Sequence, residues 1–199
     1  MSLALLDWRR RVAAVYAEVR RLASDDPAGA HAFWRTERQR LFREHPESAD
    51  RNAALRVAPY DPAYRFDAVV HTDVEPVRIE VATATDGVVP FERIGRVLID
   101  PVGALDVWWL ASYGGGVWLP VRDGNPDTYG GGRYVLDTVK GADLGGDVDP
   151  SGRRGSLVVD LNFAYNPSCA YDERWACPLA PPGNVVAASV EAGELVPGA

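Results

Sequence analysis

From Tyr60 onward the sequence is a succession of short runs of β-branched and aromatic residues, separated by Gly, Pro, Asn and Asp. Such runs are typical of β-strands joined by tight turns. No stretch with helical periodicity lies between them, which indicates antiparallel connections in a sandwich or barrel. The predicted strands are residues 64–71, 77–83, 92–99, 105–111, 117–121, 133–139, 156–162 and 185–190.

The first 45 residues follow a different pattern. Apolar residues recur at three- and four-residue steps over 3–23, which predicts an amphipathic helix. Asp26 and Pro27 are a typical N-cap and first helical residue, so a second helix is predicted over 27–44, before His45-Pro46. The predicted fold is α+β, with two N-terminal helices packed on a mainly antiparallel β-barrel or sandwich-like body. We expect a single domain over 1–199, with a helical arm at 1–45 and a β body at 60–193.

Composition narrows the class of protein. The 199 residues carry a formal net charge of −7, which argues against nucleic-acid binding, because that requires a basic face. No apolar run approaches the roughly 18 residues of a membrane span, so no membrane partner is expected. The first residues lack the pattern of a secretory signal and there are only two cysteines, so we expect a cytoplasmic protein. The oligomeric state is left open.

The turn-rich segment 119–134 is the first candidate site. Arg122 and Arg133 could each hold a carboxylate or phosphate with a planar guanidinium. Three successive glycines allow the backbone to approach a ligand or another strand closely. The alternative is a long hairpin loop held by local turns and by an Arg122–Asp123 or Arg133–Asp127 ion pair. The candidate residues here are the ligand-binding Arg122, Asp123, Arg133 and Tyr134, and the proton donor Tyr129.

The second candidate segment begins at Asp160, at a predicted strand end, and runs irregularly for about twenty residues. Its four aromatic residues argue against disorder and favour an ordered loop that positions polar groups. Asp160 or Asp123 is the candidate general base, and Tyr165 a donor or orienting group. Asn162 and Asn166 are candidate ligand-binding residues. Trp108, in a predicted strand, is either core or part of the pocket lining, and the tail after Gly193 is expected to fray.

The two cysteines, Cys169 and Cys177, allow three interpretations. They could form a disulfide that closes a short loop, remain buried free thiols, or supply a nucleophile at Cys169. The last requires a neighbouring base or positive charge. The chain lacks the closely spaced ligand pairs of a zinc site, so no metal is expected. The Walker and GxGxxG patterns are also absent, so no cofactor is assigned.

Several motifs together resemble one known family. They are Asp-Leu-Asn-Phe-Ala-Tyr-Asn-Pro-Ser-Cys-Ala-Tyr from residue 160, Cys-Pro-Leu-Ala-Pro-Pro-Gly-Asn from 177, Glu-Ala-Gly-Glu from 191, Thr-Tyr-Gly-Gly-Gly-Arg-Tyr from 128, Trp34-Arg35, and Phe42 followed by His45-Pro46. They resemble the bacterial and archaeal family catalogued as domain of unknown function 1684, and the resemblance covers nearly the whole chain. The one departure is Leu161, where the family has Phe. The resemblance implies a family identity and a single-domain architecture, and it implies no activity.

The sequence is compatible with two classes of function. The first is a small-molecule enzyme or ligand-binding protein, with an arginine pocket for an anionic ligand at the mouth of a β-barrel. Hydrolysis, isomerisation and cyclisation are all compatible with the candidate residues. The alternative is a non-catalytic structural or protein-interaction module, in which the Arg, Asp and Asn residues of the two loops only stabilise the fold. Whether these groups meet at an open cavity, or bond only to the protein itself, distinguishes the two.

Overall fold

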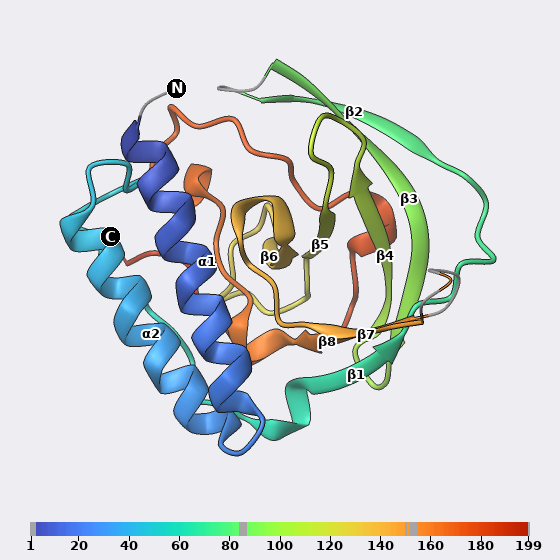
Figure 1. The fold of residues 1–199 in the computed structure, drawn as a ribbon, viewed down its shortest axis with the longest axis horizontal. Helices are drawn as coiled ribbons and strands as arrows, with labels where there is room; N and C mark the ends of the chain where they lie inside the picture. Colours follow the sequence, from blue (N-terminus) through green and yellow to red (C-terminus); the bar gives the residue numbers. More distant parts are fainter. Residues whose placement is uncertain (1–2, 84–86, 150, 152–154, 199) are drawn as a thin grey trace.

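The computed structural model describes residues 3–83, 87–149, 151 and 155–198. It contains two helices, α1 (Leu3–Ala23) and α2 (Pro27–Glu44), followed by β-strands and short 3-10 turns. Both helices occupy the predicted residues. Asp26 caps α2 by accepting a hydrogen bond from the Gly29 amide at 2.8 Å, and Pro27 stands at the first turn. The helices lie side by side along one side of the β body (Figure 1).

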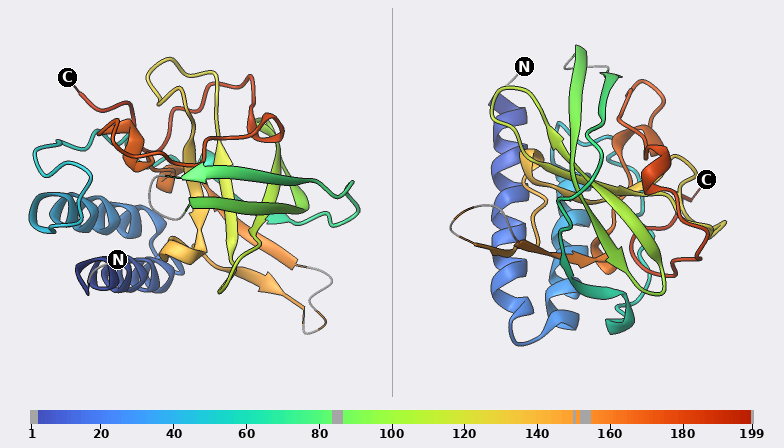
Figure 2. Two further views of the ribbon diagram at one scale, coloured as in Figure 1. Left: turned by 90° about the horizontal axis from the view of Figure 1, so that it is seen from above. Right: turned by 90° about the vertical axis from the view of Figure 1, so that its right-hand side faces the viewer.

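The strands form two antiparallel sheets, which confirms the α+β fold. The larger has the order β2-β3-β4-β5-β6 and the smaller β1-β8-β7. Their bounds are β1 (Arg65–Val69), β2 (Arg78–Thr83), β3 (Gly87–Ile99), β4 (Gly103–Leu110), β5 (Val117–Val121), β6 (Arg133–Asp137), β7 (Gly146–Val148) and β8 (Gly155–Asp160). The β2–β3 hairpin lies on the side of the molecule away from the helices (Figures 1 and 2).

The described strands do not close into one continuous barrel, and the sandwich-like alternative is the correct one. Among the described residues, backbone pairing between the two sheets is limited to isolated bridges, between His71 and Arg96 and between Tyr134 and Tyr165. The reason is that regular pairing stops where β8 ends. After β8 the backbone forms the 3-10 turn Leu161–Phe163. Among the described residues, the segment that follows this turn pairs with β6 through a single bridge.

The structure differs from the sequence-based prediction in two further local elements. The segment predicted as a strand over 185–190 forms only one parallel bridge, between Val185 and Arg122, so that prediction is wrong. It directly follows the 3-10 turn Pro182–Asn184, and it then contacts the chain after β5 through separate hydrogen bonds, such as Gly124 N to Ala188 O at 2.9 Å. Conversely, the short strand β7 lies in a Gly- and Asp-rich stretch that predicts only a loop.

The core joins the helices to the irregular C-terminal segment. Trp34 of α2 is fully buried and packs edge-on against Phe163, with ring centroids 5.4 Å apart. A second aromatic cluster fills the larger sheet, where Trp118 contacts Phe91 and Tyr134. Buried aromatic pairs add stability beyond their buried area. The C-terminal segment is therefore an integral part of the core.

Candidate functional site

Arg133, predicted to hold a ligand, is bound instead by the protein itself. Its side chain is 0% exposed and its Nη2 donates to Asp123 Oδ2, itself 1% exposed, at 2.8 Å. Its Nη1 donates to the carbonyls of Ala192 and Glu194, the second at 3.0 Å. Burial lowers the pKa of Arg133. This guanidinium ties the loop after β5 to the C-terminal segment.

Arg122, the other predicted anion holder, is exposed and does not join Arg133. Its backbone is occupied in the bridge to Val185. Of the two ion pairs considered from the sequence, Arg133 takes Asp123 as its partner rather than Asp127. The two arginines therefore form no shared anion site.

Two of the three glycines before Arg133 approach the protein's own chain, whereas Gly130 faces open space. A Cβ at Gly131 would lie 2.6 Å from the Tyr129 ring, and one at Gly132, where φ is +92°, would lie 2.8 Å from Ala180. The Gly131 carbonyl accepts a hydrogen bond from the Ala180 amide at 3.2 Å. The close approach that glycine allows is used here to pack segment 178–181 against the loop.

Glu194 is the most extensively bonded residue that the sequence analysis did not select. It is 0% exposed and binds Arg38 of α2 through both carboxylate oxygens, with Nη2 to Oε2 at 3.1 Å. It also accepts hydrogen bonds from the Asn166 amide at 2.7 Å and the Tyr171 hydroxyl at 2.9 Å. The expectation that the tail frays after Gly193 is wrong, because Glu194 anchors it. Only its place in the family-like motif distinguished this residue.

Asn166 belongs to the same network. Its side-chain amide donates to the Leu195 carbonyl at 2.8 Å, while its Oδ1 is buried without a hydrogen-bond partner. The guanidinium of Arg38 lies 4.8 Å from the centre of the Tyr165 ring, within the range of a cation–π contact. Asn166 and Tyr165 are thus beside a buried ion pair rather than at a described pocket.

Asp160 and Asn162 form a second buried cluster. Asp160 caps the turn that follows β8, accepting from the Asn162 amide at 3.0 Å and from its side chain at 2.8 Å. Asn162 also bonds to both backbone groups of Asp61. Its carbonyl lies 3.0 Å from His31 Nε2 of α2, so this nitrogen carries the proton. These contacts join α2, the chain before β1 and the chain after β8.

Two groups of this cluster have pKa values that are shifted in opposite directions. Burial raises the pKa of Asp160 to about 6 and lowers the pKa of His31 to about 4. Between about pH 4 and 6 the folded protein binds the Asp160 proton more tightly than the unfolded chain, so this contribution to stability falls as pH rises. Over a similar window the unfolded chain binds the His31 proton more tightly, so that contribution rises with pH. The two contributions largely cancel in the natural protein.

Single substitutions should expose these opposing contributions. On going from pH 4 to 7, the unfolding free energy of Asp160→Asn should increase by about 3 kcal/mol relative to the natural protein, and that of His31→Gln should decrease by a similar amount. Urea denaturation at a series of pH values measures both changes. Asp61→Asn, which removes a similar capping carboxylate at a more exposed position, is the matched control. Parallel pH profiles for the natural protein and Asp160→Asn would contradict the assignment.

Trp108 and Tyr134 both direct their polar atoms into the protein. Trp108 Nε1 donates to Asn184 Oδ1 at 2.8 Å, and the Tyr134 hydroxyl donates to the Pro178 carbonyl at 2.5 Å. Both side chains belong to the aromatic cluster of the larger sheet. They position the C-terminal segment, and neither borders a pocket described below.

Tyr129 and Cys169 are the two predicted catalytic residues that do meet. The Tyr129 hydroxyl donates to Cys169 Sγ at 3.7 Å. Both cysteines are free and partly buried, and burial raises the pKa of Cys177 to about 11. Of the three interpretations open from the sequence, the structure has partly buried free thiols.

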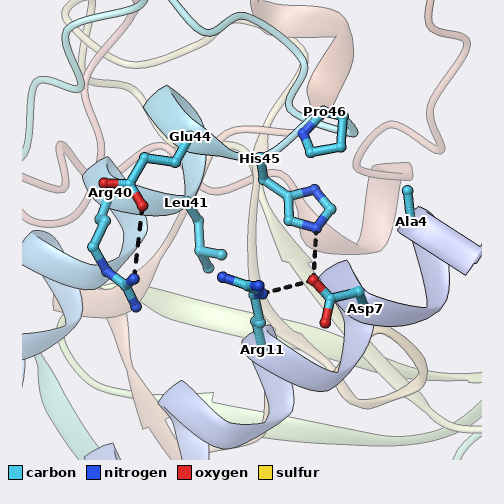
Figure 3. A pocket seen from close by; sticks show the side chains of 8 residues that line it. All are labelled: Ala4, Asp7, Arg11, Arg40, Leu41, Glu44, His45 and Pro46. Atoms are coloured by element: carbon cyan, nitrogen blue, oxygen red, sulfur yellow. Dashed lines mark hydrogen bonds and ion pairs between the residues drawn. The ribbon is translucent and has the colours of Figure 1, made fainter.

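A first pocket lies between the start of α1 and the end of α2, and is called here the helix-end pocket (Figure 3). Its volume is about 280 Å³. Asp7 accepts from Arg11 at 2.7 Å and from His45 Nε2 at 3.2 Å, and Arg11 lowers the pKa of Asp7. The Glu47 amide donates to His45 Nδ1 at 3.1 Å, so both imidazole nitrogens are occupied. The remaining lining residues are Ala4, Arg40, Leu41, Glu44 and Pro46.

A second pocket, larger and more open, shares Pro46 with the helix-end pocket and is called here the arginine pocket. It has a volume of about 570 Å³. It is lined by Arg43, Pro46, Ser48, Ala49, Asp50, Arg51, Asn52 and Arg174. Arg174 pairs with Asp172 at 3.0 Å, whereas Arg43 and Arg51 form no ion pair within the described ranges. The Ser48 hydroxyl is buried and has no hydrogen-bond partner.

The sequence analysis did not identify either pocket. Arg43 and Arg51 come from the end of α2 and the loop that follows it, whereas Arg174 comes from the C-terminal segment, more than 120 positions later. The only sequence signal that pointed toward an arginine-lined site was an excess of basic residues. The first 45 residues contain nine arginines and six acidic residues. Across the described ranges, no group of three or more His, Cys, Asp or Glu side chains could hold a metal ion.

These features define an α+β protein with two helices beside a pair of antiparallel sheets and an arginine-lined surface pocket. Residues 51–195 match the sequence model of the family described as "Protein of unknown function (DUF1684)", and the chain belongs to this family. This confirms the resemblance found in the motifs. None of the described helices is both long and apolar enough to span a membrane.

One similar solved structure is the NMR structure of an uncharacterised protein from Haloarcula marismortui. It is 30% identical to this chain, the match covers 81% of this chain and 89% of that one, and the TM-score is 0.55. No curated protein matches the chain. This relative has the same kind of fold, and its description names no activity.

Proposed function

We propose that this protein binds a small anionic molecule in the arginine pocket. The observation that carries the proposal is the convergence of Arg43, Arg51 and Arg174 on one open cavity, with the first two lacking ion-pair partners among the described residues. Ligand pockets have volumes of roughly 300–1,000 Å³, and the volume of this pocket, about 570 Å³, lies well within that range. The anionic ligand expected from the sequence is thus assigned to different arginines.

The chemistry of the lining favours a ligand with more than one negative charge. A guanidinium forms paired hydrogen bonds with a carboxylate or phosphate, and three of them can neutralise several charges. Asp50 opposes a ligand that is anionic over its whole surface, and it can accept a hydrogen bond from a hydroxyl group. Phosphate esters and hydroxylated polycarboxylates combine these two properties.

Binding without catalysis is the form of the proposal that the neighbouring groups support. His45, which precedes the pocket residue Pro46, uses Nδ1 to accept from Glu47 and Nε2 to donate to Asp7. It therefore has no free nitrogen with which to remove a proton from a ligand. The alternative role of the loop residues as structural groups is favoured separately by the complete burial of Arg133.

Titration calorimetry with pyrophosphate and with citrate, at constant ionic strength, tests the proposal. We expect saturable binding by at least one of them, and a loss of about tenfold or more in affinity for Arg43→Ala or Arg51→Ala. Arg35→Ala is the matched control, since it removes the same charge from an exposed position on α2 outside the pocket. Absence of saturable binding, or equal weakening by Arg35→Ala, would overturn the proposal.

A further inference from the structure

Ser48 is the one residue of the arginine pocket whose polar side chain is buried without a partner among the described residues. It lines the cavity together with the three arginines, yet it is only 5% exposed and its Oγ has no hydrogen-bond partner. Five other buried side-chain atoms in the described ranges also lack a partner, and none of their residues lines either pocket. An unpaired buried hydroxyl is unfavourable, and proteins retain such groups mainly at functional sites.

The segment that carries Ser48 is fastened to α2 on both sides of this residue. The Ser48 amide donates to the His45 carbonyl at 3.1 Å, directly after the end of the helix. Farther along, the side chain of Gln39 donates to the Ala53 carbonyl at 3.1 Å and accepts from the Leu55 amide at 2.9 Å. The backbone at Ser48 is therefore fixed, and the hydroxyl changes direction by rotation about a single bond, Cα–Cβ.

We propose that the Ser48 hydroxyl donates a hydrogen bond to a phosphoryl group in the arginine pocket, so that the pocket prefers phosphate esters to polycarboxylates. This inference rests on the proposed function of the pocket, and it selects one of the two ligand classes considered there. Guanidinium groups have donors only, so they offer the hydroxyl no acceptor. The carboxylate of Asp50 accepts instead from the Asn52 amide at 2.8 Å. An anionic oxygen of the ligand supplies the acceptor that Ser48 lacks.

The positions of the donors favour a tetrahedral anion. Arg43 is in the last turn of α2, Arg51 is in the loop that follows, and Arg174 is in the C-terminal segment. Donors carried by separate segments, with the hydroxyl in addition, reach a bound group from different directions. A phosphoryl group presents three strong acceptor oxygens that are not in one plane with the phosphorus, whereas a carboxylate presents only two oxygens, in one plane.

The same hydroxyl should affect the free protein in the opposite sense. Without a ligand, burial has removed water from Oγ and no protein group replaces it among the described residues. Ser48→Ala removes this unpaired group, so the variant should have the same urea midpoint as the natural protein or a higher one. Unchanged or increased stability together with weaker binding distinguishes a ligand-binding hydroxyl from one that serves the fold.

Titration calorimetry of the natural protein and of Ser48→Ala, with pyrophosphate and with citrate at constant ionic strength, tests the inference. We expect pyrophosphate to bind more tightly than citrate. Ser48→Ala should weaken pyrophosphate binding about tenfold, as expected for the loss of a hydrogen bond to a charged group, and should weaken citrate binding less. Ser24→Ala is the matched control, because it removes an exposed hydroxyl that lies outside the pocket.

The outcomes separate this inference from the proposed function. Saturable binding that Ser48→Ala leaves unchanged would overturn the role of Ser48 while anion binding stands. Tighter binding of citrate, or an equal loss for both ligands, would overturn the preference for phosphoryl groups. A lower urea midpoint for ligand-free Ser48→Ala would assign the hydroxyl to the fold. Absence of binding of either ligand by the natural protein would refute the proposed function, and this inference with it.

Discussion

Glu194→Ala should lower the free energy of unfolding by about 3–5 kcal/mol, the cost of breaking a buried ion pair by removing one partner. The substitution leaves Arg38 largely buried without its counter-charge, because that side chain is only 14% exposed. It also removes the acceptor for the Asn166 amide and the Tyr171 hydroxyl. Urea or thermal denaturation measures the loss.

Two variants make the expected loss specific to the ion pair. Glu191→Ala removes an exposed carboxylate three residues earlier and should change stability by no more than about 0.5 kcal/mol. Glu194→Gln keeps an oxygen acceptor while removing the charge, so it should be intermediate. If Glu194→Ala proved as stable as Glu191→Ala, the C-terminal segment would not be anchored as described.

Arg133→Met should be similarly costly, by about 3–5 kcal/mol, because the buried Asp123 then loses its counter-charge and keeps only neutral donors such as the Asn125 amide. The carbonyls of Ala192 and Glu194 also lose the Arg133 donor. Combining Arg133→Met with Asp123→Asn removes both charges, so the double variant should be more stable than the sum of the two single losses predicts. A double-mutant cycle by urea denaturation gives this coupling.

Arg122→Met is the control for the same loop. It replaces an exposed arginine next to Asp123 and should leave stability within about 0.5 kcal/mol of the natural protein. Simple additivity in the cycle, or a large effect of Arg122→Met, would contradict the structural role assigned to Arg133. Neither arginine lines the arginine pocket, so both variants should bind pyrophosphate with the natural affinity while folded.

Local patterns were sufficient to predict most of the elements. Both helices have the predicted bounds, because periodicity and the Asp26–Pro27 cap act over a few residues. The strand β7 was missed, since Gly146–Val148 carries no apolar alternation, and its pairing with β8 supplies what its own sequence lacks. The run at 185–190 was assigned to a strand because β-branched residues favour extended backbone, whether or not a neighbour pairs with it.

For the candidate site, local sequence patterns predicted which residues are unusual and did not predict their partners. The sequence identified Arg133, Asp160 and Asn162 as unusual, and all three are buried and bonded in the structure. Their partners could not be predicted, because they are distant in the chain: Arg133 reaches residues 59 and 61 positions later. The arginine pocket was missed in part for the same reason, since Arg174 joins the segment 43–52 only in the complete tertiary structure.

The pairing of Arg38 with Glu194, 156 positions later, has a consequence for biosynthesis. A nascent chain that has already made α2 and most strands still holds Arg38 and Arg133 without the acceptors that residues 192–194 supply. Burying either guanidinium at that stage is unfavourable, so the native core cannot pack completely before residues 192–194 have been translated. Maturation of the core therefore awaits emergence of residues 192–194 from the ribosome.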